Sequence, residues 1–223
     1  MAKPNTRQRI IESALRLFNE KHFGNVTTAE LAADLGIAEG NLWYHFKSKR
    51  ALLDAIAARY VEYTRGRLAI EPGAGDVLED YARLLAALSE EVRAFRFIFR
   101  DRADFGEFPA SMAAAVGGIY EASWAQMGRF FRALKAAGHL DIPEAWIGPL
   151  VTNSIIVIRF APELFREMRL AEEDAGRLSD WGIVQHLACF GDWLRPEARR
   201  WLIERLDLGA AVASAAGFAA VTA

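Results

Sequence analysis

One stretch near the N-terminus constrains the fold of this chain more than any other. Residues 27–30, Thr-Thr-Ala-Glu, form a capping box, in which a hydroxyl and a carboxylate satisfy free N–H groups at a helix start. Leu31 and the small Ala32 follow on that helix, and Gly36 can end it because glycine tolerates positive φ. The next inward position, Leu42, belongs to a second helix. This spacing predicts a helix-turn-helix.

The rest of the chain also reads as helix after helix, with no convincing alternation of polar and apolar residues that would predict strands. An all-α fold follows. Prolines and glycines mark several helix ends. Beyond two short helices within residues 27–46, helices are expected over residues 6–20, 48–67, 76–99, 109–137, 143–169, 179–194 and 196–206. The Ala-rich segment 209–223 is either a last packed turn or a frayed tail.

The expected helices group into two parts joined by a longer helix. Residues 1–50 form an N-terminal three-helix domain that contains the helix-turn-helix, and residues 51–70 form the connecting helix. The turn-rich sequence Glu71-Pro72-Gly73 follows that helix. Residues 71–223 then form a larger helical body, and the boundary is expected inside the connecting helix.

Composition indicates a folded protein of the cytoplasm. Of the 223 residues 52% are hydrophobic and 25% charged, and no uncharged apolar run reaches the ~18 residues of a membrane span. The N-terminal residues lack the apolar core of a signal peptide. The single cysteine, Cys189, agrees with a reducing compartment and is expected to be a small buried side chain.

The net charge of −2 is unevenly divided along the chain. Residues 1–70 hold 11 Lys and Arg against 7 Asp and Glu, whereas the remainder holds 16 against 22. A basic N-terminal part on an acidic body suits a protein of which one end meets phosphates. The asymmetry is modest, so it supports nucleic-acid binding only weakly.

The second helix of the motif presents a polar and aromatic face. If Leu42 and Phe46 point inward, the outward residues include Asn41, which can read adenine, and Gly40, which permits close backbone approach. Ser48 can cap the following helix, whose start would face the DNA backbone. The aromatic residues could instead be core residues and Lys47 to Arg50 a solvated cluster. The agreement of spacing and caps favours DNA binding.

The stretch from Thr6 to Leu53 resembles the DNA-binding domain of the TetR family. The resemblance rests on Thr27-Thr28-Ala29-Glu30-Leu31-Ala32, on Gly36-Ile37, and on Asn41-Leu42-Trp43-Tyr44-His45-Phe46-Lys47-Ser48-Lys49. It covers about the first quarter of the chain and is more specific than a bare helix-turn-helix pattern.

The resemblance implies that Trp43, Tyr44, His45 and Lys49 contact DNA and that Thr28 bonds a phosphate, and the outward face and basic flank of the second helix add Glu39, Gly40, Asn41 and Lys47. Phosphate contacts are expected from Thr28, Tyr44, His45, Lys47 and Lys49, and base contacts from Glu39, Gly40, Asn41 and Trp43. One position departs from the family. Ala38 stands where members commonly carry a hydroxyl residue that caps the second helix. The absence of that cap should lower the local stability of the helix by about 1 kcal/mol.

Membership also implies a body that forms a homodimer and holds an effector pocket. The sequence from residue 150 to residue 165 is apolar nearly all round, so a helix there needs cover on several faces, and a partner subunit is the natural one. Residues 181–194 are a second candidate for the interface, with burial inside the monomer as the alternative. A two-fold dimer would read a pseudo-palindromic double-stranded operator.

Aromatic and soft side chains in the body suggest a small effector that is largely apolar or aromatic. Ordinary core packing explains the same residues, and it is the better explanation for any one of them. The candidates are Phe95, Phe99, Tyr120, Trp124, Met127, Phe131 and Asn153. Arg159 could bind an effector carboxylate, pair with an acid such as Glu121 or Asp192, or lie exposed; an internal or intersubunit pair is favoured.

Two other classes of function fit the sequence less well. For an enzyme, the nearest constellation is His186, Cys189 and Asp192, which lie along one helix side and cannot surround a substrate. No cofactor motif is present, and four His and one Cys are too scattered to predict a metal site. The other class is a helical ligand-binding or adaptor protein without DNA binding; Ala38 permits it, but Tyr44, His45 and Lys49 argue against it.

Overall fold

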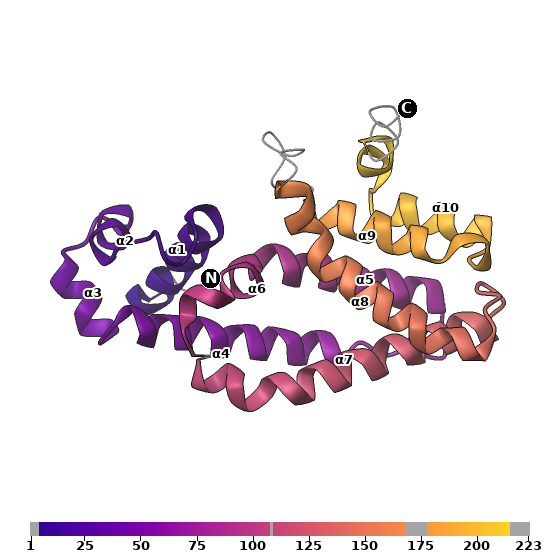
Figure 1. Ribbon diagram of the computed structural model, residues 1–223, viewed down its shortest axis with the longest axis horizontal. Coiled ribbons are helices and arrows are strands. Elements are labelled where there is room, and N and C mark those ends of the chain that lie inside the picture. The colour runs from indigo at the N-terminus through magenta and orange to yellow at the C-terminus, as the bar shows by residue number, and fades with distance from the viewer. Residues whose placement is uncertain (1–4, 108, 168–177, 215–223) are drawn as a thin grey trace. The chain divides into compact units, whose positions relative to one another are not determined.

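The structure is a computed structural model, and it describes residues 5–107, 109–167 and 178–214. Within these ranges the backbone forms helices and no strand, apart from one isolated antiparallel bridge between Leu140 and Leu194. The prediction of an all-α fold is therefore confirmed. The α-helices along the chain (Figure 1) are α1 (Thr6–Lys21), α2 (Thr28–Leu35), α3 (Glu39–His45), α4 (Lys49–Leu68), α5 (Val77–Ala94), α6 (Arg96–Arg100), α7 (Ala110–Ala136), α8 (Glu144–Glu167), α9 (Leu178–Cys189) and α10 (Pro196–Arg205). Two 3-10 turns, η1 (Arg102–Phe105) and η2 (Gly191–Trp193), join some of them.

The described residues divide into two compact units. The first contains residues up to 65 together with 94–119, and the second contains residues 66–93 and those from 120 onward. One division therefore falls inside α4, between residues 65 and 66. This point lies within residues 51–70, which the sequence predicted as the connecting helix. The sequence placed everything after residue 70 in one body, so the assignment of 94–119 to the first unit differs from that expectation.

Aromatic residues explain why α6 and η1 belong to the first unit. Phe95, Phe97 and Phe105 are buried in the same apolar cluster as Phe18 of α1 and Tyr60 of α4. The ring centroids of Phe18 and Phe97 lie 5.3 Å apart, and those of Tyr60 and Phe95 lie 5.4 Å apart. Burial of such large side chains contributes on the order of 2 kcal/mol each, so the segment completes the core of this unit.

The sequence predicted one helix over residues 76–99, but the structure breaks it after Ala94. The side-chain amide of Asn19 fills the break. Its Nδ2 donates to the carbonyl oxygen of Ala94 at 2.8 Å, and its Oδ1 accepts from the N–H of Phe97 at 3.0 Å. Because both ends of the break are bonded by a side chain, the backbone groups freed there keep partners.

The second unit is built around rings from α5, from α7 and from Phe190, which follows α9 (Leu178–Cys189). Tyr81, Phe130, Phe131 and Phe190 are almost fully buried there. The predicted helix over 179–194 ends early, at Cys189, because residues 193 and 194 pair with residues 140 and 141. The N–H of Asp141 donates to the carbonyl of Trp193 at 2.8 Å, on the line of the bridge between Leu140 and Leu194.

The structure describes the first part of the Ala-rich segment 209–223, for which the sequence left open a packed turn or a frayed tail. Residues 209–214 are helical, and Ala211 is buried against Trp181. This part of the Ala-rich segment is therefore a packed turn. Residues 215–223 lie outside the described residues.

Candidate nucleic-acid interface

The start of α2 has the predicted capping box. The Thr27 hydroxyl oxygen accepts from the N–H of Glu30 at 3.1 Å. The Glu30 carboxylate accepts from Lys21 at 2.5 Å, and this contact lowers the pKa of Glu30. The Thr27 cap therefore fixes the first turn of α2, while Lys21 of α1 holds the Glu30 side chain.

The turn between α2 and α3 has the conformation that Gly36 predicts. Gly36 adopts φ of +64°, in the left-handed region, and the N–H of Ile37 donates to the carbonyl of Ala32 at 3.0 Å. This pattern closes the carbonyl groups at the end of α2. Leu31 and Leu42 are fully buried, so the two helices are fixed against the core of the first unit.

The recognition face of α3 comprises Glu39, Gly40, Asn41, Trp43 and Tyr44. All five are exposed, and Tyr44 has 78% of its surface open to solvent. His45 is half-buried and Lys47 is exposed. The structure thus brings the expected base readers to one surface.

Two details at the ends of α3 bear on DNA binding. Ala38 makes no side-chain bond to the start of α3, as the sequence predicted. The Thr28 hydroxyl, which was expected to meet a phosphate, donates to Oε1 of Glu39 at 2.6 Å. At the other end, Ser48 Oγ accepts from the N–H of Ala51 at 3.0 Å and caps α4.

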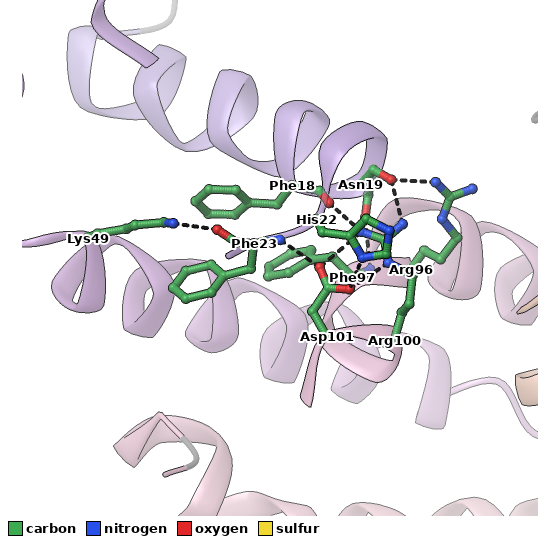
Figure 2. A network of polar contacts seen from close by, with 9 residues as sticks. All are labelled: Phe18, Asn19, His22, Phe23, Lys49, Arg96, Phe97, Arg100 and Asp101. Carbon is green, nitrogen blue, oxygen red and sulfur yellow. Dashed lines mark hydrogen bonds and ion pairs between the residues drawn. The ribbon is translucent and has the colours of Figure 1, made fainter. Parts of the chain in front are cut away.

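Lys49 has an internal partner that the sequence did not predict. Its ammonium donates to the carbonyl oxygen of Phe23 and lies 4.2 Å from the centre of the Phe23 ring (Figure 2). Burial lowers the pKa of Lys49. The ammonium carries three N–H groups, so one internal bond leaves donors for a phosphate.

A polar network joins His22 and Phe23, the two residues after α1, to the end of α6 (Figure 2). The carboxylate of Asp101, 1% exposed, accepts from the N–H of Phe23 at 2.7 Å and from Arg100 at 2.6 Å, and lies 2.8 Å from Nδ1 of His22. Burial alone would raise the pKa of Asp101, but these bonds lower it below its ordinary value.

The network also closes the end of α1. Arg100 donates to the carbonyl groups of Phe18 at 2.6 Å and Asn19 at 2.8 Å. His22, the next residue after α1, adopts φ of +72°, which is unusual for a residue other than glycine. Such a backbone persists where its surroundings fix it, and the bonds of Asp101 to His22 and Phe23 do so. No sequence signal pointed to this network, because its partners are about 80 residues apart.

The structure assigns the candidate effector residues to different units. Phe95 and Phe99 belong to the first unit and pack beside Tyr60. The other five belong to the second unit: Met127 and Phe131 are buried in its core, while Tyr120, Trp124 and Asn153 are exposed.

A different part of the second unit contains a pocket of about 340 Å³. It lies between α5 and α9, with Leu85 and Ile183 on its apolar side. Ser89 and Asp180 are on its polar side, 3.4 Å apart between Oγ and Oδ1. Its lining is therefore mixed, and it shares no residue with the predicted effector set.

The residues considered for catalysis differ in their surroundings: His186 is buried, Cys189 is half-buried, and Asp192 is exposed in η2, beyond the end of α9. His186 is fully buried, its Nε2 lies 2.5 Å from the hydroxyl of Tyr81, and burial lowers its pKa to about 3. Burial also raises the pKa of Cys189. The imidazole and the thiol are thus both neutral at pH 7. No group of three or more potential metal ligands occurs among the residues that the structure describes.

An exposed apolar stripe follows α8. Ile156, Phe160 and Leu164, spaced four residues apart, are each about half exposed. By length and composition alone α8 could cross a membrane, but the core helix of a soluble protein passes the same test. The other interface candidate is different: Ile183 and Leu187 of α9 are buried within the second unit, which favours the alternative of burial.

Gly182 allows α9 to pack closely on α8. A side chain there would lie 3.3 Å from the carbonyl oxygen of Ile158 and 3.4 Å from the ring of Pro162. On α8, the half-buried Arg159 places its guanidinium 4.8 Å from the ring centre of Tyr120. Arg159 is thus in contact with α7 through an aromatic ring.

Family models match most of the chain. The family described as bacterial regulatory proteins of the tetR family matches residues 10–56, and the one described as bacterial transcriptional repressor matches residues 59–202. The second match alone covers more than half of the chain.

Individual relatives agree with these matches. The tetracycline repressor protein class D of Escherichia coli is 40% identical over 87 residues, or 37% of this chain and 37% of that protein. The class A repressor from transposon 1721 of Escherichia coli is 47% identical over 55 residues, or 25% and 24%. The chain thus spans less than half the length of these curated relatives. A TetR-family transcriptional regulator from Marinobacter aquaeolei VT8 is 27% identical, with a TM-score of 0.75 over 92% of this chain and 99% of that one.

Proposed function

This chain belongs to the TetR family of bacterial regulatory proteins, and on that premise we propose that it is a sequence-specific DNA-binding repressor of transcription, released from its operator by a small molecule. The observation that carries the proposal is the exposed face of α3, fixed by the Gly36 turn and by buried Leu42. A short helix held in this way can enter a major groove with its first turns against the base edges.

The proposed DNA contacts fall into two groups. Side chains with donors at the rim hold phosphates and set the register, and side chains on the face of α3 meet the bases. The phosphate group consists of Thr28, Tyr44, His45, Lys47 and Lys49, and the base group of Glu39, Gly40, Asn41 and Trp43. The surface of this unit therefore combines both kinds of contact.

The working form is a homodimer joined through α8. A contiguous apolar stripe on a monomer supports an interface, and Ile156, Phe160 and Leu164 form one. In a two-fold dimer the same stripe would meet its copy, and two recognition helices would lie about 34–36 Å apart or wider on a pseudo-palindromic operator.

The effector is a small molecule, largely apolar or aromatic, that binds the body in one of two conformations. Effector binding favours the form with the wrong spacing of recognition helices, so operator affinity falls. Among the candidate contacts in the second unit, Met127 and Phe131 belong to its buried core, and Tyr120, Trp124 and Asn153 are exposed. The mixed pocket between α5 and α9 offers a second location. The protein acts in the cytoplasm, where the DNA is.

The test begins with selection of duplexes from a random pool by the full-length protein. Affinity for the recovered operator is then measured against salt, because each neutralised phosphate contributes a slope of about −0.9 in log K against log salt. Lys47→Ala is expected to reduce that slope by about 1 and to weaken binding on all sequences alike. Lys135→Ala, which removes the same charge from the second unit, is the matched control and should change neither.

A protein that selects no sequence and shows no salt slope would be the adaptor without DNA binding, and the proposal would be wrong. The dimer is tested separately by sedimentation. Phe160→Glu is expected to give a monomer at micromolar concentration with at least tenfold weaker operator binding, because one half-site then binds alone. The control Ala136→Glu places the same charge on an exposed part of α7. A dimer that survives Phe160→Glu would contradict the α8 interface.

A further inference from the structure

A single hydrogen bond joins the first residues of the two motif helices. The hydroxyl of Thr28, at the start of α2, donates to Oε1 of Glu39, at the start of α3, at 2.6 Å. A threonine hydroxyl has one hydrogen to donate. While Glu39 holds that hydrogen, Thr28 cannot donate to a phosphate oxygen, which can only accept.

Glu39 does not depend on Thr28 to stay where it is. It is exposed and lies in the first turn of α3, where the helix dipole favours a negative charge. Ala38 contributes no side-chain bond to that turn. A Glu39 carboxylate released from Thr28 would therefore keep a favourable position at the leading end of the recognition face.

We propose that operator binding exchanges this bond, so that a phosphate takes the Thr28 hydroxyl and the freed Glu39 carboxylate accepts from the amino group of a cytosine. The inference rests on the proposed function. It assigns Glu39 as a specificity-determining residue and Thr28 as the group that couples a phosphate contact to the identity of one base.

Cytosine follows from the hydrogen-bonding groups of the major groove. A carboxylate has acceptors alone, so it cannot bond guanine N7 or O6 or thymine O4, which are acceptors as well. Adenine offers its N6 amino group beside the acceptor N7, which repels a second carboxylate oxygen. Cytosine offers its N4 amino group with no acceptor beside it on that base. Glu39 therefore favours cytosine over the other three bases.

The exchange makes a mismatch cost two contacts. On a site with guanine or thymine at that position, Glu39 finds no donor and keeps its bond to Thr28. The phosphate then loses the Thr28 hydroxyl as well. Gly40 leaves room for this rearrangement, because nothing lies within 4 Å of where its side chain would begin. Discrimination at this base pair is thus larger than one hydrogen bond alone would give.

The experiment repeats the duplex selection with wild type and with Glu39→Gln. Wild type is expected to select cytosine at one position of each half-site. Glu39→Gln should turn that position toward adenine, because an amide pairs its donor and acceptor with N7 and N6, and should leave the other positions unchanged. The preference at the position is expected to change by about tenfold or more. The control Glu30→Gln alters the same charge on α2, where Glu30 pairs with Lys21, and should leave the selected sequence unchanged.

Thr28→Val separates the exchange from simple base reading, since it keeps the shape of the side chain and removes the hydroxyl. It is expected to weaken binding to the cytosine site and to spare the mismatched site, so the ratio of the two affinities falls by about threefold to tenfold. Equal weakening on both sites, or a Glu39→Gln variant that selects the wild-type sequence, would overturn the exchange. Thermal melts of the variants establish that both fold, as is expected at the exposed Glu39 and the half-buried Thr28.

The two proposals fail differently. If wild type selects no duplex and has no salt slope, DNA binding itself is wrong. If wild type selects an operator that contains no position dependent on Glu39, the repressor proposal stands and the exchange alone is wrong.

Discussion

Two of the polar junctions in the first unit have opposite character. The junction between α2 and α3 is exposed, and its bond between Thr28 and Glu39 joins residues 11 apart. The junction between α1 and α6 is buried at Asp101, and its bond from Arg100 to the carbonyl of Phe18 joins residues 82 apart. Exposed groups can change partners with water or DNA at low cost, whereas a buried group that loses its partner bears the full desolvation penalty. The first junction suits recognition, and the second holds the unit together.

The largest effect that this contrast predicts is that of Asp101→Ala. Its removal leaves the N–H of Phe23 and the side chain of Arg100 without their carboxylate, and breaking a buried charge pair costs about 3–5 kcal/mol. We expect a loss of that order in the free energy of unfolding, measured in urea by circular dichroism. The control Asp104→Ala removes an exposed carboxylate three residues away and should cost about 0.5 kcal/mol or less. A similar loss in both variants would remove the contrast between the junctions.

Acid should remove the contribution of the Asp101 carboxylate to the free energy of unfolding. Its pKa is lowered in the folded protein, so the stability that the carboxylate contributes is complete above the unfolded value of about 3.9 and is lost as pH falls through the folded value. The difference in stability between wild type and Asp101→Asn should therefore be constant from about pH 7 to 5 and shrink below about pH 4. Urea midpoints over this range measure it. A difference that grows in acid would assign the low pKa to another carboxyl.

The contrast also explains which parts of the site the sequence predicted. The capping box, the Gly36 turn and the missing cap at Ala38 depend on neighbours within a few residues, and all three were confirmed. The end of α5 was not predicted, because it depends on Asn19, 75 residues earlier. Local spacing contains no information about such a partner.

The body shows the same limit in its packing. Apolar periodicity identified the helix from residue 150 to residue 165 as one that needs cover, and its half-exposed Phe160 agrees with that. Periodicity could not distinguish α8 from α9, which is equally apolar but has Ile183 buried inside the unit. Six of the seven effector candidates were selected for aromatic or soft side chains rather than for a shared location, and the set came to lie in two units.

Lys49 lies between the two junctions and should show both behaviours. Its ammonium bonds the carbonyl of Phe23 and faces an aromatic ring, yet it is only half-buried. Lys49→Met keeps the stem and is expected to lower the free energy of unfolding by about 1 kcal/mol. It should also reduce the salt slope of operator binding by about 1.

Lys47 provides the comparison for Lys49. Because Lys47 is exposed, Lys47→Met should reduce the salt slope by about 1 and leave stability within about 0.5 kcal/mol of wild type. If Lys49→Met lowers stability and leaves the slope intact, Lys49 belongs to the buried junction alone and its proposed phosphate contact is wrong.

The smallest effect tests the exposed junction itself. Ala38 precedes α3 with φ of −67° and ψ of 144°, which a capping serine adopts without strain. Ala38→Ser should add a bond to a free N–H of α3 and stabilise the unit by about 1 kcal/mol, seen in the urea midpoint, while Ala38→Gly should gain less than the serine because glycine has no side-chain acceptor. If the Thr28–Glu39 bond exchanges as proposed, the added serine should not alter the base that is selected at the Glu39 position. A change in that base would mean that the rigidity of the start of α3, rather than the chemistry of the Glu39 carboxylate, sets the sequence that α3 reads.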